Sequence, residues 1–264
     1  MNEPHHRDNA PYPDSRKIFW TGGWDSTFRV VDLVLHEGLT VLPFYVIDEG
    51  RQSLTQEIDT LFHIHELVSA QTHRGSLLPI VFLRADQATR DEDLREKFHA
   101  LQRKRGIGEQ YIWLAEITKE HGLDGIEMCV QHNEDFFFLT GSRNPGTDGY
   151  GAAPLRPVLP ENSPESLFNL FSFPTLGISK REMATLAAER GFTKVLEHSW
   201  FCHMPTRAGK PCGFCVPCRM TAAKGLSQRL PPSARTRGII IRALERGHAP
   251  WRARRWVKRR LRGV

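Results

Sequence analysis

Short apolar runs alternate with longer amphipathic stretches through the first half of the chain. The apolar runs predict β-strands at residues 17–20, 40–47, 78–83 and 125–130. Between them, apolar positions spaced three and four residues apart predict helices at residues 26–37, 54–69 and 108–121. Because strands that alternate with helices form a parallel sheet covered by helices, the expected fold class is α/β.

Composition divides the 264 residues into four parts. A chain of this length can bury a full core, so one α/β domain with a smaller appendage is expected rather than two equal domains. The four parts are an extended N-terminal lead-in at 1–16, the α/β domain at 17–178, a helix with a cysteine cluster at 179–230, and a basic C-terminal tail at 231–264.

Two segments in the second half have contrasting patterns. Residues 135–174 are rich in Gly, Pro, Asn and Ser, which is typical of a mobile cover over a site or of an irregular connection. Ser179 and Glu182 then have the spacing of a capping box, which predicts a helix that ends near Gly191.

The first predicted strand leads into the loop Thr-Gly-Gly-Trp-Asp-Ser-Thr at residues 21–27. Gly22 and Gly23 allow the backbone to approach phosphate oxygens, and the following helix presents its positive N-terminal end. The hydroxyl groups of Thr21, Ser26 and Thr27 add donors. Because the loop leaves the carboxyl end of a parallel strand, where ligands bind in such sheets, we expect it to hold a pyrophosphate. An ordinary strand-to-helix turn is the alternative.

Four of the five cysteines lie close together near the end of the chain, at Cys202, Cys212, Cys215 and Cys218. Two consecutive Cys-x-x-Cys steps and one upstream thiol supply four soft ligands, the set of a closed tetrahedral zinc site. Four thiolates leave no position for water, so we expect structural Zn²⁺. An iron–sulfur cluster and unmetallated or redox-active thiols are the alternatives, and four cysteines make His203 unnecessary as a ligand.

Charge is distributed unevenly along the chain. Residues 233–264 hold 11 of the 36 Lys and Arg residues but only one of the 30 acidic residues, so they carry about +10 and the remainder about −4. Trp251 and Trp256 are interleaved with these cations, a mixture that suits nucleic acid or another acidic partner. A solvated tail, or a helix packed on a neighbouring subunit, is the alternative.

The sequence has no run of 18 apolar residues, and its first residues lack the apolar core of a signal peptide. We therefore expect a cytoplasmic protein with no membrane segment.

The loop at residues 21–26 resembles the Ser-Gly-Gly-x-Asp-Ser loop of the PP-loop ATP pyrophosphatases, with threonine in the first position. Together with the cysteine cluster, it resembles the 7-cyano-7-deazaguanine synthase family. Residues 44–52 are similar to that family's second strand and following turn, and Ser179-Lys180 and residues 199–219 are similar to its later motifs. The turn departs from the family pattern in the order Gly-Arg-Gln at 50–52 and in Glu49, where a substrate would be bound.

The resemblance implies a set of site residues. It implies catalytic roles for Lys180 and Asp25, substrate binding by Arg51 and Gln52, and Mg²⁺ between the phosphates of ATP. It also implies a homodimer. The residues implied to bind ATP are Thr21, Gly22, Gly23, Trp24, Asp25, Ser26, Thr27, Tyr45, Val46, Ile47 and Lys180.

The expected reaction is ATP-dependent adenylation of a carboxylate, on 7-carboxy-7-deazaguanine or a related deazapurine, followed by transfer to ammonia. The product is an amide or, after a second activation, a nitrile, with release of AMP and pyrophosphate. One alternative is transfer of the activated acyl group to a macromolecular amine. Another is a PP-loop RNA-modifying enzyme such as a tRNA thiolase, with Cys129 carrying sulfur, although such a cysteine is ordinarily a small buried hydrophobic residue. A third is a nucleic-acid-binding module on a degenerate nucleotide fold.

Overall fold

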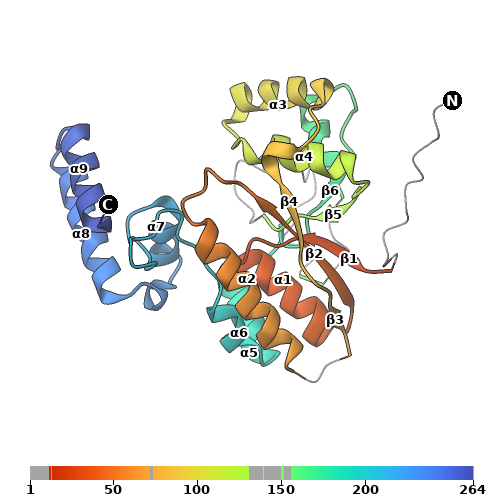
Figure 1. Cartoon of the computed structure of the whole chain (residues 1–264), viewed down its shortest axis with the longest axis horizontal. Coiled ribbons are helices and arrows are strands. Elements are labelled where there is room, and N and C mark those ends of the chain that lie inside the picture. Colours follow the sequence, from red (N-terminus) through yellow and green to blue (C-terminus); the bar gives the residue numbers. More distant parts are fainter. Residues whose placement is uncertain are drawn as a thin grey trace.

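The computed structural model describes residues 12, 14–71, 74–130, 139, 150–151 and 156–263 (Figure 1). At its centre is a sheet whose strand order is β3-β2-β1-β5-β6, with β4 also paired to β2. Every described strand pairing is parallel, which confirms the predicted α/β class. The strands are β1 (Arg16–Phe19), β2 (Thr40–Ile47), β3 (Ser76–Leu77), β4 (Val81–Arg84), β5 (Ile126–Glu127) and β6 (Phe171–Ser172).

The strand predicted at 78–83 is divided in the structure. β3 pairs with the start of β2, and β4 pairs with its end, from Phe44 to Ile47. Pro79 lies between the two segments and has no N–H to donate to a ladder, so the interruption has a local cause. The strand predicted at 125–130 is also shorter, since only Ile126–Glu127 is strand.

The three predicted helices of the first half are confirmed. They are α1 (Trp24–Val31), which continues as a π-helical segment over Asp32–His36, α2 (Leu54–Ser69) and α4 (Gln110–Glu120). The capping box is also confirmed, because the Ser179 hydroxyl accepts from the Glu182 N–H at the start of α5 (Lys180–Glu189).

A further helix, α3 (Glu92–Arg105), was not predicted from the sequence. Its apolar positions are few, and only Leu94, Phe98 and Leu101 are buried. Its ends carried a clear signal, however. The Asp91 side chain accepts a hydrogen bond from the Leu94 N–H at 3.0 Å, and Gly106 ends the helix with φ of 67°.

Helices cover both faces of the sheet (Figure 1). On one face lie α1, α2, α5 and α6 (Thr193–Glu197), and on the other lie α3, α4 and a 3-10 helix at Pro164–Leu170. Neighbouring strand residues therefore enter different cores: Ile18 packs with the first group and Phe19 with the second. The segment predicted as a cover, 135–174, lies partly outside the described residues, and its described part at 156–174 includes the 3-10 helix and β6.

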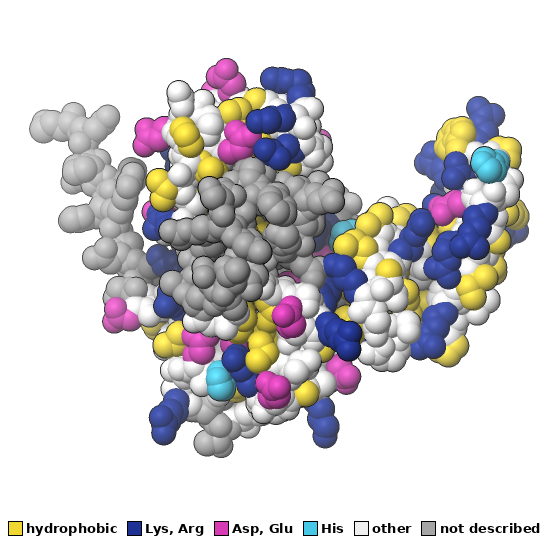
Figure 2. Space-filling model, turned by 180° about the vertical axis from the view of Figure 1, so that it is seen from behind, with side chains coloured by type: hydrophobic (Ala, Val, Ile, Leu, Met, Phe, Trp, Pro, Cys, Tyr) yellow, Lys and Arg dark blue, Asp and Glu magenta, His cyan; other side chains and the backbone are white. Residues whose placement is uncertain are grey.

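The C-terminal part is helical and folds beside the α/β domain (Figure 1). After α7 (Val216–Ala223), a short 3-10 turn at Ser227–Arg229 leads to α8 (Pro232–Arg246) and α9 (Trp251–Arg262). The residues predicted to be a basic tail thus form two helices rather than a solvated chain, because α8 buries Ala234 and Ile241 against the cysteine region. Lys and Arg side chains gather over this part of the surface (Figure 2). No described helix is long and apolar enough to cross a membrane.

A buried ion pair links α1 to the sheet behind the loop. Arg29 of α1 donates two hydrogen bonds of 2.9 Å to the carboxylate of Glu127 in β5, and both side chains are buried. Arg29 also donates to Glu37 and to the Tyr150 hydroxyl. The pair therefore fixes the position of α1 relative to the sheet.

We expect Glu127→Ala to lower the free energy of unfolding by about 3–5 kcal/mol, because it leaves a buried guanidinium without its bidentate partner. Urea denaturation followed by circular dichroism measures the change. Lys97→Ala, which breaks an exposed pair with Asp93, is the control and should cost less than about 0.5 kcal/mol. Equal effects of the two substitutions would contradict a structural role for the buried pair.

Candidate functional site

The glycine loop forms a tight bend between β1 and α1. Gly22 has φ of +67°, and a Cβ atom there would lie 3.2 Å from Thr60 Cγ2 and 3.5 Å from the Glu57 carbonyl oxygen. Gly23 is the N-cap of α1, and the amide groups of the first helical turn have no partner within a helix. The loop therefore presents helix N–H groups at the carboxyl end of β1, as the sequence predicts.

The hydroxyl groups of the loop lie in two environments. Ser26 Oγ lies 3.3 Å from Thr21 Oγ1 and 3.4 Å from the Thr21 nitrogen, so these two residues lie together at the loop. Thr27 is fully buried, and its hydroxyl accepts a hydrogen bond of 3.1 Å from the Trp20 indole. Thr27 thus ties α1 to the end of β1.

Lys180 reaches the loop from a distant part of the chain. Its Nζ donates to Asp25 Oδ2 at 3.1 Å, although the two residues are 155 positions apart. Both side chains are about one-fifth exposed. The other carboxylate oxygen of Asp25 is buried and has no hydrogen-bond partner among the described residues. Asp25 can therefore accept one further donor or a cation, and this buried oxygen is a ligand type that suits Mg²⁺.

A second lysine lies close enough to Lys180 and Asp25 for their charges to affect its pKa. Lys224 follows α7, and burial lowers its pKa, as does the charge of Lys180, while the charge of Asp25 acts in the opposite direction. Sequence reasoning missed Lys224, which no motif marks.

Trp24 is the first residue of α1. It is buried beneath Arg229, whose guanidinium carbon lies 4.8 Å from the centre of a Trp24 ring. Burial lowers the pKa of Arg229 to about 10, and the guanidinium donates to the carbonyl and hydroxyl of Ser199. Arg229 therefore fixes the C-terminal region against the start of α1.

A cavity of about 260 Å³ opens beside the loop at the carboxyl ends of the strands. Thr21 and Ser26 of the loop, Tyr45 and Val46 of β2, and Arg51 are among its lining residues. The structure thus brings five predicted site residues together. The cavity walls on the other side come from Phe19, Phe44, Gln110, Tyr111, Trp113, Leu114, Met128, Cys129, Val130 and His203.

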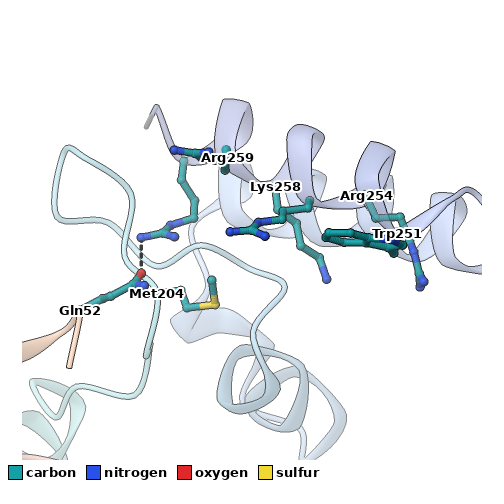
Figure 3. A pocket seen from close by; sticks show the side chains of 8 residues that line it. Gln52, Met204, Trp251, Arg254, Lys258 and Arg259 are labelled. Atoms are coloured by element: carbon teal, nitrogen blue, oxygen red, sulfur yellow. Dashed lines mark hydrogen bonds between the residues drawn. The ribbon is translucent and has the colours of Figure 1, made fainter. Parts of the chain in front are cut away.

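The other eight predicted ATP- and substrate-binding residues are not among the described lining residues of this cavity: Gly22, Gly23, Trp24, Asp25, Thr27, Ile47, Gln52 and Lys180. Gln52 instead accepts a hydrogen bond of 2.6 Å from Arg262 of α9 and lines a separate groove (Figure 3). In this structure, therefore, the predicted substrate residue Gln52 contacts the C-terminal helix.

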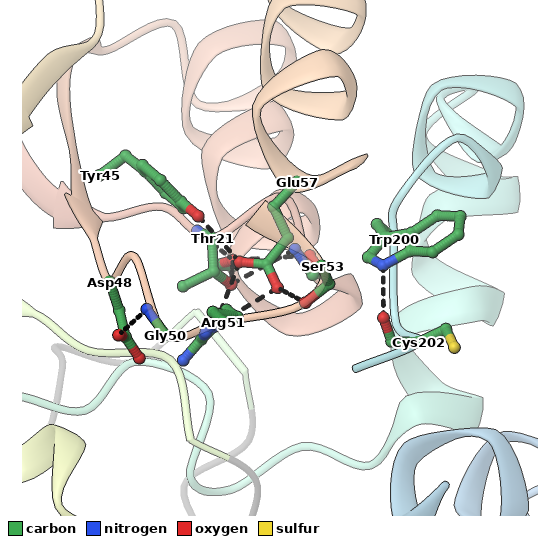
Figure 4. A network of polar contacts seen from close by, with 11 residues as sticks. Thr21, Tyr45, Asp48, Gly50, Arg51, Ser53, Glu57, Trp200 and Cys202 are labelled. Atoms are coloured by element: carbon green, nitrogen blue, oxygen red, sulfur yellow. Dashed lines mark hydrogen bonds and ion pairs between the residues drawn. The ribbon is translucent and has the colours of Figure 1, made fainter. Parts of the chain in front are cut away.

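Arg51 is held at the cavity by a buried acid (Figure 4). Arg51 Nη1 lies 3.1 Å from Glu57 Oε2, which also accepts from the Tyr45 hydroxyl at 3.0 Å. Ser53 Oγ donates to Glu57 Oε1 at 2.6 Å. Burial and the Glu57 carboxylate raise the pKa of Tyr45, so this hydroxyl stays protonated and donates. Ser53 and Glu57 were not predicted from the sequence. The available signal was Glu57, an acid on the apolar face of the helix expected at residues 54–69.

The four cysteines of the cluster converge. All four sulfur atoms lie within 4.8 Å of one another, and the Cys212–Cys218 and Cys202–Cys215 sulfur pairs are each 3.9 Å apart. Zn–S bonds of about 2.3 Å in a tetrahedron place sulfur atoms about 3.8 Å apart, so the cluster fits zinc. Backbone N–H groups of residues 212, 214 and 215 donate to the sulfurs of Cys202 or Cys212, which favours thiolates.

Helix α8 packs closely against the cysteine loop, with one glycine on each side of the contact. A Cβ atom on Gly213 would lie 1.8 Å from the carbonyl oxygen of Ala234, and one on Gly238 would lie 2.5 Å from the Gly213 carbonyl oxygen. Arg237 donates to the carbonyl oxygens of Pro211 and Cys212. The metal-binding loop and α8 therefore form one packed unit.

Cys129 lines the cavity but lacks the features of an activated thiol. It packs at the edge of a hydrophobic core, and burial together with the charge of Glu127 raises the pKa of its thiol. The thiolate is the reactive form, so this environment disfavours nucleophilic attack. His203 lies in the same cavity lining, and the cluster of four cysteines does not include it.

The cysteine region is joined directly to the glycine loop. The N–H of Trp200 donates to the Gly22 carbonyl oxygen at 2.8 Å, and its indole donates to the Cys202 carbonyl oxygen at 2.7 Å (Figure 4). One residue thus bonds both to the loop and to the first cysteine of the cluster.

We expect Cys215→Ser to remove the metal, because three thiolates bind Zn²⁺ far more weakly than four. Mass spectrometry of the purified chain should show about one zinc in the parent and much less in the variant. The unfolding midpoint should fall by about 10 °C, which corresponds to about 3 kcal/mol for a chain of this size.

Cys129→Ser is the matched control and should retain the metal, since Cys129 lies outside the cluster. Zinc-free parent protein that remains fully folded after chelation would contradict a structural metal at this site.

Comparisons with known proteins leave the family of the chain open. No family model matches the sequence, and no curated protein matches it. The functional interpretation therefore depends on the residues and geometry of the site itself.

Proposed function

We propose that the chain uses ATP to adenylate a carboxylate and passes the activated acyl group to ammonia. The contact between Lys180 and Asp25 carries the proposal, because it brings a cation from α5 to the glycine loop at the start of α1. Helix N–H groups and a lysine at one position are what a departing pyrophosphate requires. The same loop, through Thr21 and Ser26, borders the cavity.

In the first step, a carboxylate oxygen of the substrate attacks the α-phosphorus of ATP, and the bond to the bridging oxygen breaks. Pyrophosphate leaves with that bonding pair. Lys180 neutralises the charge that develops on it, and the loop amides donate hydrogen bonds to its oxygens. The buried, unpartnered oxygen of Asp25 would hold Mg²⁺, which neutralises phosphate charge when bound.

In the second step, the nitrogen of ammonia attacks the acyl carbon, the bond to AMP breaks, and loss of a proton gives the amide. A second adenylation, on the amide oxygen, releases a second pyrophosphate; the bond from the acyl carbon to the AMP oxygen then breaks, and loss of both N–H protons gives the nitrile. The chain's part in both steps is to position the reactants and to exclude water.

The cavity supports a planar, anionic acceptor. Arg51 provides a cation for the substrate carboxylate, and Glu57 and Ser53 limit its motion from behind. Aromatic side chains of Phe19, Tyr111 and Trp113 line the same space, which suits a flat ring. A deazapurine carboxylate, the acceptor that the sequence resemblance implies, has both properties.

The proposal is tested by incubating the chain with ATP, Mg²⁺, ammonium and 7-carboxy-7-deazaguanine, with analysis by mass spectrometry. We expect AMP, pyrophosphate and the amide, with the nitrile if both activations occur. AMP without amide or nitrile would exclude this acceptor, and the absence of AMP with a panel of carboxylates would exclude adenylation.

We expect Lys180→Ala to reduce AMP formation by about 100-fold or more while the fold is retained, because the charge on the leaving pyrophosphate loses its cation. Arg181→Ala removes a neighbouring exposed cation of α5 and should retain near-normal activity. Circular dichroism and zinc content verify that both variants are folded. Comparable AMP formation by the two variants would remove Lys180 from the site.

One observation favours a second candidate, a sulfur-transferring PP-loop enzyme that acts on RNA. Cys129 lies in the same cavity lining as Thr21 and Ser26, where an activated group would be delivered. The raised pKa of Cys129 argues against this role. Loss of activity in Cys129→Ala would favour sulfur transfer, and unchanged AMP and amide formation would favour the first candidate.

A further inference from the structure

The largest concentration of cations lies outside the candidate active site, along α9. A groove of about 900 Å³ runs between this helix and the residues opposite, Gln52 and Met204 (Figure 3). We call it the basic groove. Its α9 side carries five cations, Arg254, Arg255, Lys258, Arg259 and Arg262.

These cations are not balanced by acids in the groove. Among the described residues, no Asp or Glu lines it. Glu245 of α8 lies 3.4 Å from Lys258 and is shared with Arg219. Arg262 uses neutral partners, Gln52 and the Pro205 carbonyl oxygen. The groove therefore keeps a strong positive potential that an anionic chain would neutralise.

The apolar side of α9 is already occupied. Val257 and Leu261 pack against the hydrophobic core around the cysteine cluster. A basic amphipathic helix that binds a membrane surface inserts that side into lipid. Because Val257 and Leu261 are covered in this way, the cations of α9 are better suited to a polyanion in the groove than to a lipid surface.

Aromatic side chains accompany the cations. Trp251 is 57% exposed and lines the groove, and Trp256 is 61% exposed elsewhere on the helix. The Arg255 guanidinium lies 5.9 Å from the Trp251 ring centre. An exposed indole beside arginines provides a surface on which a base can stack while the cations contact phosphates.

We propose that the basic groove binds a single strand of nucleic acid, through phosphate contacts from α9 and base stacking on Trp251. The binding surface goes beyond the proposed ATP-dependent reaction and does not depend on it. Gln52 and Met204 line the groove, and their sequence neighbours Arg51 and His203 line the cavity, so a bound strand would pass close to the candidate active site.

The test is fluorescence anisotropy of the full chain with a labelled single-stranded RNA of mixed sequence, at salt concentrations from about 50 to 200 mM. The groove variant is R254Q/R259Q. The matched control, R252Q/R260Q, removes the same charge from the same helix at residues outside the groove lining. Zinc content and circular dichroism verify folding of both.

We expect the groove variant to bind about tenfold more weakly near physiological salt, and the slope of log K against log salt to decrease by about 1.4 units for two lost phosphate contacts. The control should lose less than about twofold in affinity. Trp251→Ala should weaken binding with little change in slope, because stacking releases no counterions.

The proposal would be overturned if the chain bound no RNA at the lowest salt, or if the groove and control variants lost equal RNA affinity. It would also be overturned if Arg254 and Arg259 were needed for binding to phosphatidylserine vesicles but not for binding to RNA. Lys180→Ala should still bind RNA, so failure of the ATP reaction and failure of the groove give different results.

Discussion

The hydrogen bond from the Trp200 N–H to the Gly22 carbonyl oxygen is the contact on which the site depends most. Gly22 has a left-handed conformation, and its neighbours leave little space around its Cα. Trp200 in turn precedes Cys202 by two positions and bonds to its carbonyl oxygen. The conformation of the glycine loop is therefore coupled to the cysteine cluster, and a metal at that cluster would stabilise the loop without touching a substrate.

The distribution of acids explains why the two ends of the chain differ in electrostatic behaviour. In the α/β domain, buried carboxylates hold specific cations: Glu127 holds Arg29, Glu57 holds Arg51, and Asp32 holds Arg190. These pairs fix side chains around the loop and cavity. In the C-terminal helices, Glu245 is the one acid available to many cations, so α9 retains its charge for contacts with other molecules.

Sequence patterns predicted the features that have local causes. The parallel sheet, the helix capped by Ser179, and the clustering of the four cysteines follow from alternation, from capping chemistry and from ligand spacing. Lys180 and Asp25, which the family resemblance implied to belong to one site, are in contact in the structure.

Features that arise from long-range packing were not predictable in the same way. Gln52 was expected in a substrate site but bonds to Arg262, because α8 and α9 fold back toward the α/β domain. For residues 231–264 a helix was only one of the alternatives, since a high density of arginine conceals the few apolar positions that pack. Glu57 was missed because a buried acid is recognised only from the partners that surround it, here Tyr45, Arg51 and Ser53.

The bond between Trp200 and Gly22 also has a consequence for synthesis on the ribosome. The glycine loop is among the first segments to be translated, yet Trp200, whose N–H donates to the Gly22 carbonyl oxygen, and Lys180 emerge only after most of the chain. Contacts between residues that are far apart in sequence form late in folding, because the entropy cost of closing the intervening chain arises before the contacts stabilise the fold. A nascent chain that has not reached Cys218 would therefore lack the contacts that hold the glycine loop, and the loop would reach its final conformation only near the end of translation.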